Sequence, residues 1–255
     1  MMKNIFDTHA HYDDEAFDED RFELLETIHR EGVELIINCG CDEKSSRTAL
    51  SFAEKYNFMY AAAGIHPENI SENYESELLA IKEMASHEKI VAIGEIGLDY
   101  YWDTSKKALQ KEVFEKQLIL ANELSLPVII HDREAHGDTM ELLRKHRPKG
   151  VLHCFSGSVE TAKEAVSLGM FIGFGGALTF KNARKAVEVA EAIPLEKILL
   201  ETDCPYMAPV PMRGKRNQSS YIEFVAQKLG EIKGLDPQTV ADKANENGRR
   251  LFNII

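Results

Sequence analysis

Short runs of hydrophobic residues alternate with longer amphipathic stretches from one end of the chain to the other. Eight runs have the length and composition of buried strands. They recur about every 27 residues, roughly the length of one strand and one helix in a (β/α)8 barrel. Continuous runs such as Leu35-Ile36-Ile37 are typical of parallel strands covered on both faces. The expected strands are residues 4–11, 33–39, 58–64, 90–95, 127–131, 150–154, 170–175 and 198–203.

Between these runs, hydrophobic positions recur at helical spacing. In residues 21–31, for example, Phe22, Leu25 and Ile28 share one face, and glutamate and arginine residues occupy the other. Two further helices are expected after the eighth strand, where they would complete the outer layer. The predicted helices are residues 21–31, 43–56, 76–87, 105–124, 139–147, 159–168, 182–192, 221–233 and 237–247.

The pattern predicts an α/β fold, a (β/α)8 barrel of the TIM type with eight parallel strands and extra C-terminal helices. The 255 residues suit one such barrel, and no compositional break or proline-rich linker divides them, so we expect a single domain over residues 1–255. A chain of this length buries roughly 70–75% of its unfolded surface and needs no disulfides. The regular alternation could also indicate a solenoid, but no residue-level repeat of fixed period accompanies it.

Six residues with metal-ligating side chains stand at the carboxyl ends of five predicted strands. A parallel barrel gathers its catalytic groups at these ends. Residues i and i+2 of a strand face the same way, so His9 and His11 can share one ion. The six candidates are His9, His11, Glu95, His131, His153 and Asp203.

These residue types favour a pair of divalent ions. Imidazole nitrogen suits Zn²⁺, whereas carboxylate oxygen also accepts Mg²⁺ and Mn²⁺, so the identity of the metal stays open. Glu95, on the fourth strand, could bridge two ions, and His131 and His153 would hold the second. Asp203 could contact the first ion and accept a proton from a metal-bound water. Glu201 would lie one layer deeper and orient a ligand, or it would pair with a lysine or arginine inside the barrel.

The net charge and the hydropathy of the chain argue against two classes of protein, those with an extended nucleic-acid-binding surface and those that span a membrane. The net charge of −12 argues against an extended nucleic-acid-binding surface, although bound cations can reverse the field locally at a phosphate site. No hydrophobic run approaches the roughly 18 residues of a membrane span. The strand-like pattern begins almost at Met1, so we expect no secretory leader and a cytoplasmic protein.

The four cysteines predict no disulfide framework in so long a chain. We interpret Cys39 and Cys41 as small apolar thiols at a strand end, although their spacing could also indicate metal or redox chemistry. Cys154 and Cys204 each follow a candidate ligand and are expected to point away from the ligand face.

Several segments resemble the TatD-type metal-dependent deoxyribonucleases of the amidohydrolase superfamily. They extend over nearly the whole chain, in the order in which that family carries them. These segments are Phe6-Asp7-Thr8-His9-Ala10-His11, Gly64-Ile65-His66-Pro67, Gly94-Glu95-Ile96-Gly97-Leu98-Asp99-Tyr100, His131-Asp132-Arg133, His153-Cys154-Phe155-Ser156-Gly157, Glu201-Thr202-Asp203-Cys204-Pro205 and Arg213-Gly214-Lys215-Arg216-Asn217.

The resemblance implies a barrel with two divalent ions at its C-terminal mouth and 3′→5′ exonuclease action on single-stranded or frayed DNA. It places His9, His11 and Asp203 on one ion, His131 and His153 on the other, and Glu95 between them. The chain departs from the family pattern at three places, which concern loop shape and substrate preference. Tyr12 replaces a leucine, Ser219 stands where proline is frequent, and residues 13–15 are unusually acidic.

Phosphate contacts are expected from loops above the metals. Arg213, Lys215 and Arg216 follow the eighth strand, a region of such barrels that often binds phosphate, although they could also be an ordinary surface patch. His66, after the third strand, and Arg133, after the fifth, are further candidates.

Three consecutive aromatic residues follow the fourth predicted strand. Tyr100, Tyr101 and Trp102 could stack on a base, because aromatic faces bind single strands with little sequence preference. They could equally pack under a loop, and Tyr100 is the member that we select as a substrate contact.

Two alternatives to the nuclease remain open. One is hydrolysis of a different bond with the same metal centre, such as the ester of a D-aminoacyl-tRNA, an amide or a lactone. Relatives that act on amides and lactones often bridge their ions with a carboxylated lysine, which Glu95 disfavours. The other alternative is a non-enzymatic barrel that holds metal and serves as a binding or scaffold subunit. The presence of all six candidate ligands, Asp203 included, disfavours it. The oligomeric state stays open, with a monomer as one option.

Overall fold

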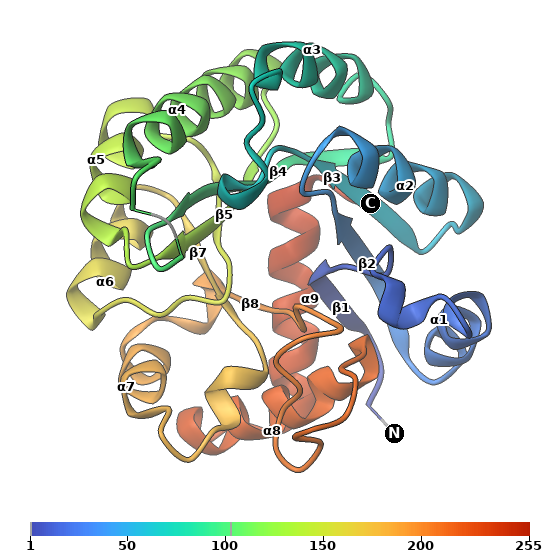
Figure 1. Ribbon diagram of the computed structural model, residues 1–255. Coiled ribbons are helices and arrows are strands. Elements are labelled where there is room, and N and C mark those ends of the chain that lie inside the picture. Colours follow the sequence, from blue (N-terminus) through green and yellow to red (C-terminus); the bar gives the residue numbers. More distant parts are fainter. Residues whose placement is uncertain (1, 103) are drawn as a thin grey trace.

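The computed structural model describes residues 2–102 and 104–255. Eight parallel strands pair in chain order, β1 with β2 and so on to β8, and helices surround them (Figure 1). The main chain of β1 meets the segment after β8, where Asp203 N–H donates to His9 O at 2.9 Å and His11 N–H donates to Cys204 O at 2.8 Å. The predicted (β/α)8 barrel is therefore confirmed. The strands are β1 (Ile5–Ala10), β2 (Val33–Cys39), β3 (Met59–Ala63), β4 (Ile90–Asp99), β5 (Val128–Arg133), β6 (Gly150–Leu152), β7 (Phe171–Phe174) and β8 (Ile198–Leu200).

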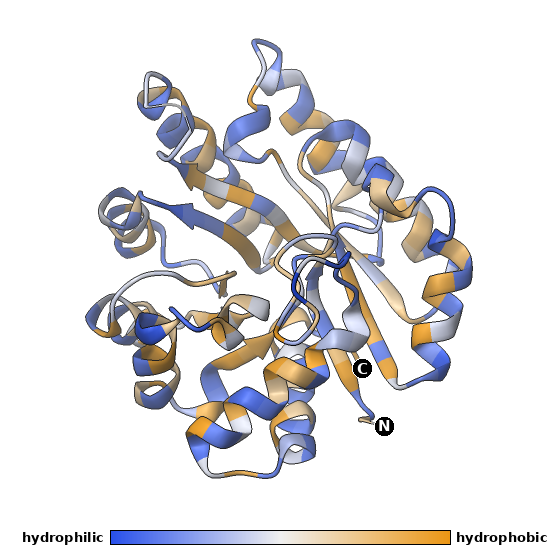
Figure 2. Cartoon of the chain, turned by 60° about the horizontal axis from the view of Figure 1, so that its bottom comes forward, coloured by the Kyte–Doolittle hydropathy of each residue, from blue (hydrophilic) through white to orange (hydrophobic). Residues whose placement is uncertain are grey.

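Helices follow the strands at the places where hydrophobic residues recur at helical spacing. Their hydrophobic positions face the sheet and their polar positions face outward (Figure 2). The α-helices are α1 (Arg21–Arg30), α2 (Glu43–Lys55), α3 (Tyr74–Met84), α4 (Lys107–Leu124), α5 (His136–His146), α6 (Val159–Ser167), α7 (Arg184–Ala192), α8 (Ile222–Lys233) and α9 (Pro237–Phe252). Short 3-10 turns include η2 (Pro67–Asn69) and η5 (Ser219–Tyr221).

The hydrophobic residues form two cores, because successive residues of a strand point to opposite faces. Ile36 belongs to the core between strands and helices, whereas Ile37 belongs to the core inside the barrel. The inner core also includes Phe252 and Ile254 from the end of the chain, and the ring of Phe252 lies 6.2 Å from that of Phe6. The C-terminal segment thus fills the end of the barrel opposite the carboxyl ends of the strands.

Five elements extend beyond their predicted bounds: β4, β5, α3, α5 and α9. β4 continues past residue 95 to Asp99 and pairs with β5 through Gly97 opposite His131 and Asp99 opposite Arg133. The glycines at positions 94 and 97 interrupt the hydrophobic run and hide this extension from the sequence pattern. α9 continues past residue 247 to Phe252, because Phe252 is buried in the inner core.

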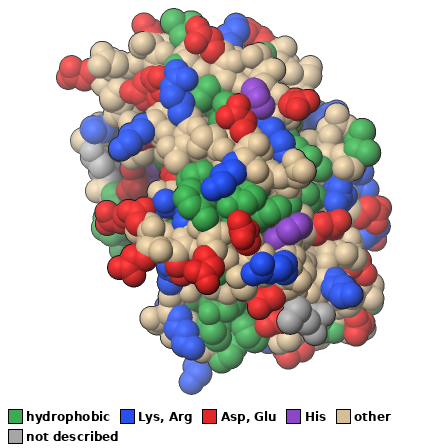
Figure 3. All heavy atoms as spheres, turned by 90° about the vertical axis from the view of Figure 1, so that its right-hand side faces the viewer, with side chains coloured by type: hydrophobic (Ala, Val, Ile, Leu, Met, Phe, Trp, Pro, Cys, Tyr) green, Lys and Arg blue, Asp and Glu red, His purple; other side chains and the backbone are tan. Residues whose placement is uncertain are grey.

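On the face shown in Figure 3, acidic and basic side chains are interspersed and no block of positive charge forms. Among the helices of the described residues, none has the length and hydrophobicity needed to cross a bilayer.

Candidate metal centre

His9 in β1 and His11 directly after it point toward each other, and their Nε2 atoms lie at the centre of the barrel mouth. His9 Nε2 and His11 Nε2 are 3.0 Å apart. His11 Nδ1 lies 3.0 Å from the carbonyl oxygen of Cys39, which can only accept a hydrogen bond. His11 Nδ1 therefore carries the proton, and Nε2 is left as the coordinating atom.

Glu95 lies between two groups of imidazoles. Its Oε2 is 3.3 Å from His9 Nε2 and 3.4 Å from His11 Nε2. Its Oε1 is 2.8 Å from His153 Nε2 and 3.1 Å from His131 Nδ1. Each oxygen therefore faces a separate pair of nitrogen donors, which is the arrangement that a carboxylate bridging two ions requires.

A carboxylate outside the predicted ligand set fixes the ring of His131. Asp99 Oδ2 lies 2.9 Å from His131 Nε2, so this nitrogen donates and Nδ1 remains free toward Glu95. Burial by itself would lower the pKa of His131, but the hydrogen bonds to Asp99 and Glu95 outweigh it and raise the pKa to about 10. Sequence reasoning missed Asp99 because it lies in the unpredicted extension of β4. Its spacing of four residues from Glu95, on the same strand face, was the available signal.

The ring of His153 stacks on that of His9, with centroids 3.9 Å apart. His153 Nδ1 lies 3.8 Å from Glu201 Oε1, and the amide of Cys154 donates to the same oxygen. Glu201 is fully buried, which raises its pKa to about 8. No lysine or arginine of the described residues pairs with it, so the alternative of a buried ion pair is wrong. Glu201 instead lies behind His153, as expected for a residue that orients a ligand.

Asp203 approaches the β1 histidines from the other side of the barrel closure. Its Oδ1 lies 3.5 Å from His11 Nε2 and 3.7 Å from His9 Nε2. Its backbone is left-handed, with φ of 57°, a conformation uncommon outside glycine. The preceding Thr202 is held by Asp7, which accepts from the Thr202 amide at 3.0 Å and from its hydroxyl at 2.5 Å. Asp7, which sequence reasoning missed, therefore connects β1 to the segment that carries Asp203.

The electrostatics keep the carboxylates charged and two of the imidazoles neutral. Burial would raise the pKa of Glu95 and of Asp203, but neighbouring histidines outweigh it and lower both. Burial lowers the pKa of His9 to about 4 and that of His66 to about 3. Contacts with neighbouring carboxylates instead raise the pKa values of His11, His131 and His153. Divalent metals bind ionised carboxylates and neutral imidazoles, so an ion held by this donor set would take the place of the protons on these three rings.

His66 lies closer to the ligand set than the sequence suggested. Its Nε2 is 3.5 Å from Glu95 Oε1, and its ring meets that of His131 edge-on at 4.5 Å. His66 Nδ1 accepts a hydrogen bond from the Glu68 amide at 3.2 Å, so the proton of the neutral ring is on Nε2. His66 thus presents a hydrogen-bond donor at the edge of the centre.

The aromatic residues after β4 differ in exposure. The hydroxyl of Tyr100 donates to Asp138 at 2.7 Å, and its buried ring is covered by Lys107. Tyr100 is therefore largely buried, and its role as a substrate contact stays a prediction. Tyr101 and Trp102 are 55% and 66% exposed, and the Arg133 guanidinium lies 3.9 Å and 5.3 Å from their ring centroids.

The predicted basic cluster divides into separate contacts. Arg216 forms an ion pair with Asp20 at 2.6 Å and lies over the ring of Phe17, so its guanidinium already has partners. Its role as a phosphate contact stays a prediction. Arg213 and Lys215 remain exposed.

Two departures from the family pattern contact each other. The Tyr12 hydroxyl lies 2.8 Å from Ser219 Oγ and accepts a hydrogen bond from the Ser219 amide at 3.0 Å. Both side chains are fully buried. The pair connects the loop after β1 to η5, beneath the loop that carries Arg213 and Lys215.

The cysteines of β2 lie nearer to the histidines than expected. Cys39 Sγ is 3.6 Å from His9 Nδ1. Cys41 Sγ is 3.9 Å from His11 Nδ1 and 3.8 Å from Glu95 Oε2. The interpretation of Cys41 as an apolar thiol is therefore incomplete, because its sulfur lies against two candidate ligands.

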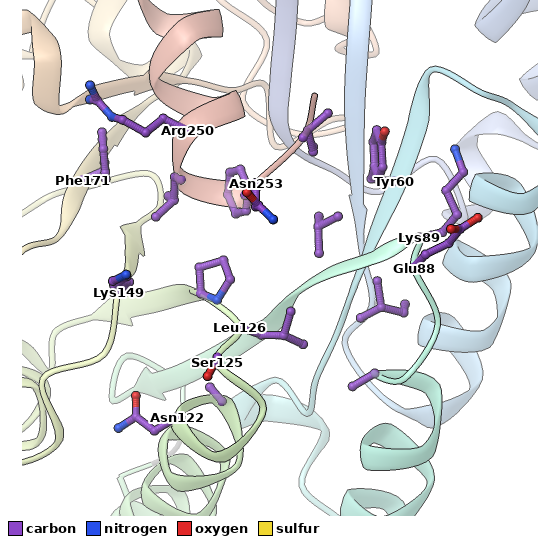
Figure 4. A pocket seen from close by; sticks show the side chains of 18 of the residues that line it. Tyr60, Glu88, Lys89, Asn122, Ser125, Leu126, Lys149, Phe171, Arg250 and Asn253 are labelled. Atoms are coloured by element: carbon purple, nitrogen blue, oxygen red, sulfur yellow. The ribbon is translucent and has the colours of Figure 1, made fainter.

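A cavity of about 1410 Å³ opens at the opposite end of the barrel (Figure 4). Its lining includes Tyr60, Lys89, Leu126, Lys149 and Arg250. None of the predicted site residues lines it.

Three comparisons with known proteins give matches that extend over the chain. Residues 6–253 match the family described as TatD related DNase. The chain is 45% identical over 253 residues to the uncharacterized metal-dependent hydrolase YabD of Bacillus subtilis (strain 168), a match covering 98% of this chain and 99% of that protein. It is 31% identical over 258 residues to the 3'-5' ssDNA/RNA exonuclease TatD of Cronobacter sakazakii, with 97% of each covered. The crystal structure of YJJV, a TatD homolog from Escherichia coli K12, superimposes with a TM-score of 0.92 at 33% identity and 100% coverage of both chains.

Proposed function

Because the chain belongs to the TatD related DNase family and is a metal-dependent hydrolase, we propose that it removes nucleotides from the 3′ ends of single-stranded or frayed DNA. The relative from Cronobacter sakazakii, named an exonuclease of single-stranded DNA and RNA, supports this class of substrate. Residues 1–255 would form one catalytic domain.

The observation that carries the proposal is the position of Glu95 between two pairs of imidazole nitrogens. His9, His11 and Asp203 would hold one ion, and His131 and His153 the other. Two divalent ions bound there would lower the pKa of a shared water and neutralise charge on the phosphoryl group. Mg²⁺, Mn²⁺ and Zn²⁺ all suit these nitrogen and oxygen donors.

Asp203 is the residue best placed to accept a proton. Its side chain is 20% exposed, whereas that of Glu95 is 5% exposed, so water reaches Asp203 more readily. The histidines around Asp203 outweigh its burial and keep its pKa low, so it is ionised at neutral pH and able to act as a base. His66 would donate its Nε2 hydrogen to a phosphoryl oxygen, since it lies at the edge of the ligand set.

The substrate strand would cross the barrel mouth over Tyr101, Trp102 and Arg133. The exposed rings would stack on a base near the cleaved end, an interaction worth about 1–3 kcal/mol per base. The Arg133 guanidinium forms no hydrogen bond or ion pair with other described residues, which leaves it free to bind a phosphate. Arg213 and Lys215 could contact phosphates farther along the strand, because both are exposed.

The test compares substrates on one metal-loaded preparation. Single-stranded DNA and RNA oligonucleotides carrying a 5′ label, a blunt duplex and a D-aminoacyl-tRNA would be assayed side by side, with the Asp203→Asn variant as control. We expect stepwise shortening of single strands from the 3′ end, slower action on the duplex, and loss of activity in the variant. Ester hydrolysis without any shortening of oligonucleotides would contradict the nuclease and favour the alternative substrate.

A further inference from the structure

The loop between β2 and α2 places Cys41 at the metal centre with a well-defined backbone. The Cys41 amide donates to Ser45 Oγ at 2.8 Å. Its carbonyl oxygen accepts from the His66 amide at 2.9 Å and from the Asn69 side chain at 3.2 Å. Asp42 and Ser45 form a capping box at the start of α2. The main chain on both sides of the thiol is therefore held by hydrogen bonds.

The sulfur lies on the side of Glu95 that faces the β1 histidines. Cys41 Sγ is 3.8 Å from Glu95 Oε2, the same oxygen that approaches His9 Nε2 and His11 Nε2. One ligand atom each from His11, Cys41 and Glu95 lie within 4.8 Å of one another. Zinc bonds of about 2.0–2.3 Å to nitrogen, oxygen and sulfur imply separations of roughly 3.5 Å between donors in a tetrahedral site. The 3.8 Å between Cys41 Sγ and Glu95 Oε2 is close to this value.

We propose that the Cys41 thiolate is a further ligand of the ion that His9, His11 and Asp203 would hold beside Glu95, and that it makes this site selective for a thiophilic ion such as Zn²⁺ or Co²⁺. The inference rests on the metal centre of the proposed function but not on its nucleic-acid substrate. Thiolate favours zinc-like ions, whereas Mg²⁺ prefers oxygen ligands alone. On binding, the ion replaces the thiol proton, which leaves to solvent.

Among the described residues, Cys41 is the only cysteine that belongs to a group of side chains able to hold a metal ion. Cys39 contacts the same histidine pair, but its sulfur faces His9 Nδ1, on the side away from Glu95, and belongs to the core inside the barrel. Cys204 is fully buried, in the core between strands and helices. Cys39 is thus a matched control for substitution of Cys41. It is a thiol two residues away in the chain that contacts His9 at the ring nitrogen facing away from Glu95.

Cobalt spectroscopy tests the assignment directly. Metal-free wild-type protein and the Cys41→Ser and Cys39→Ser variants would be titrated with Co²⁺, and bound cobalt would be measured by elemental analysis. We expect a thiolate-to-cobalt charge-transfer band in the near ultraviolet for the wild type and for Cys39→Ser, and none for Cys41→Ser. Absence of the band from the cobalt-loaded wild type, or its persistence in Cys41→Ser, would overturn the proposal.

A second measurement needs no variant and so does not depend on folding of a mutant. The rate of Cys41 alkylation by iodoacetamide would be followed by peptide mass spectrometry in metal-free protein and with saturating Zn²⁺ or Mg²⁺. We expect Zn²⁺ to slow alkylation at least roughly tenfold and Mg²⁺ to have little effect, in line with the 10–100-fold influence of single groups on metal affinity. Equal rates in all three conditions would exclude a zinc–thiolate bond.

These outcomes are separable from those of the nuclease test. A cobalt–thiolate band in a protein that leaves oligonucleotides intact would support the ligand and refute the nuclease. Shortening of oligonucleotides by a cobalt-loaded protein without the band would support the nuclease and refute Cys41 as a ligand.

Discussion

At the scale of single residues, the centre is organised around one buried carboxylate. Glu95 is only 3% exposed, and five imidazoles lie within 3.5 Å of its oxygens. A buried charge is costly unless it is compensated. The surrounding histidines therefore compensate the buried charge of Glu95, and the same charge favours binding of cations at this position.

Replacing Glu95 by glutamine should disable both halves of the centre together. Glu95→Gln keeps the shape of the side chain but removes the charge between the two groups of imidazoles. We expect kcat to fall by more than the roughly 10–100-fold that follows loss of a group supporting a ligand. Metal content per chain, measured by elemental analysis, should fall with it. Retention of full activity and of the wild-type metal content would refute the bridging role, with circular dichroism confirming that the fold persists.

The six candidate ligands could be named from the sequence because each ends a hydrophobic run. The sequence carried only weak signals for Asp99 and Cys41, because their positions relative to the other ligands depend on the direction of a side chain in three dimensions. Asp99 matters through its contact with His131 on the neighbouring strand. Cys41 matters because the loop after β2 turns its sulfur toward Glu95.

At the scale of elements, close contact between β4 and β5 sets the position of His131. Gly97 has a φ of +142°, and a Cβ added there would overlap with the carbonyl oxygen of His131. Only glycine adopts such a conformation readily. The pairing that brings Asp99 to His131 therefore depends on the absence of a side chain at Gly97.

Gly97→Ala should destabilise the protein and disturb His131. We expect the free energy of unfolding in urea to fall by more than about 1 kcal/mol, because both the conformation and the contact disfavour a side chain. Gly137→Ala is the matched control, since a Cβ there has no atom within 4 Å among its neighbours. Equal stability of the two variants would show that β4 accommodates a methyl group at this position.

The cap of α9 offers a second test at this scale. The Asp236 side chain accepts hydrogen bonds from the amides of Gln238 at 2.9 Å and Thr239 at 3.4 Å. Asp236→Ala should lower the free energy of unfolding by about 1 kcal/mol, whereas Asp236→Asn should retain most of it. Urea denaturation measures both. If the two substitutions have the same effect, the cap contributes little to the packing of α9 on the barrel.

At the scale of the whole molecule, the bound ions should stabilise the barrel that holds them. The ligands come from β1, β4 and β5 and from the segments directly after β1, β6 and β8, so an ion would connect parts of the chain that are far apart in sequence. Ligands that bind only the folded state stabilise it by mass action, by about 2.7 kcal/mol at a hundredfold excess over Kd.

Removal of metal should therefore lower the thermal transition. We expect dialysis against a chelator to reduce Tm by roughly 5–10 °C, and readdition of Zn²⁺ or Mn²⁺ to restore it. Scanning calorimetry checks this without any assay of activity. An identical Tm with and without metal would mean that the ions bind too weakly to contribute, or that the ligands do not converge on them.

The sequence alone determined the (β/α)8 architecture, because strand and helix periodicities are local and repeat eight times along the chain. It also determined the chemical types of the six candidate ligands, since polar residues at the ends of buried strands are visible without coordinates. Only the tertiary structure decided which donor atoms face one another. It brought Tyr12 to Ser219, joined the Tyr100 hydroxyl to Asp138, and placed a thiol beside Glu95. These contacts join residues from different elements through loops and side-chain rotamers, which hydrophobic periodicity does not encode.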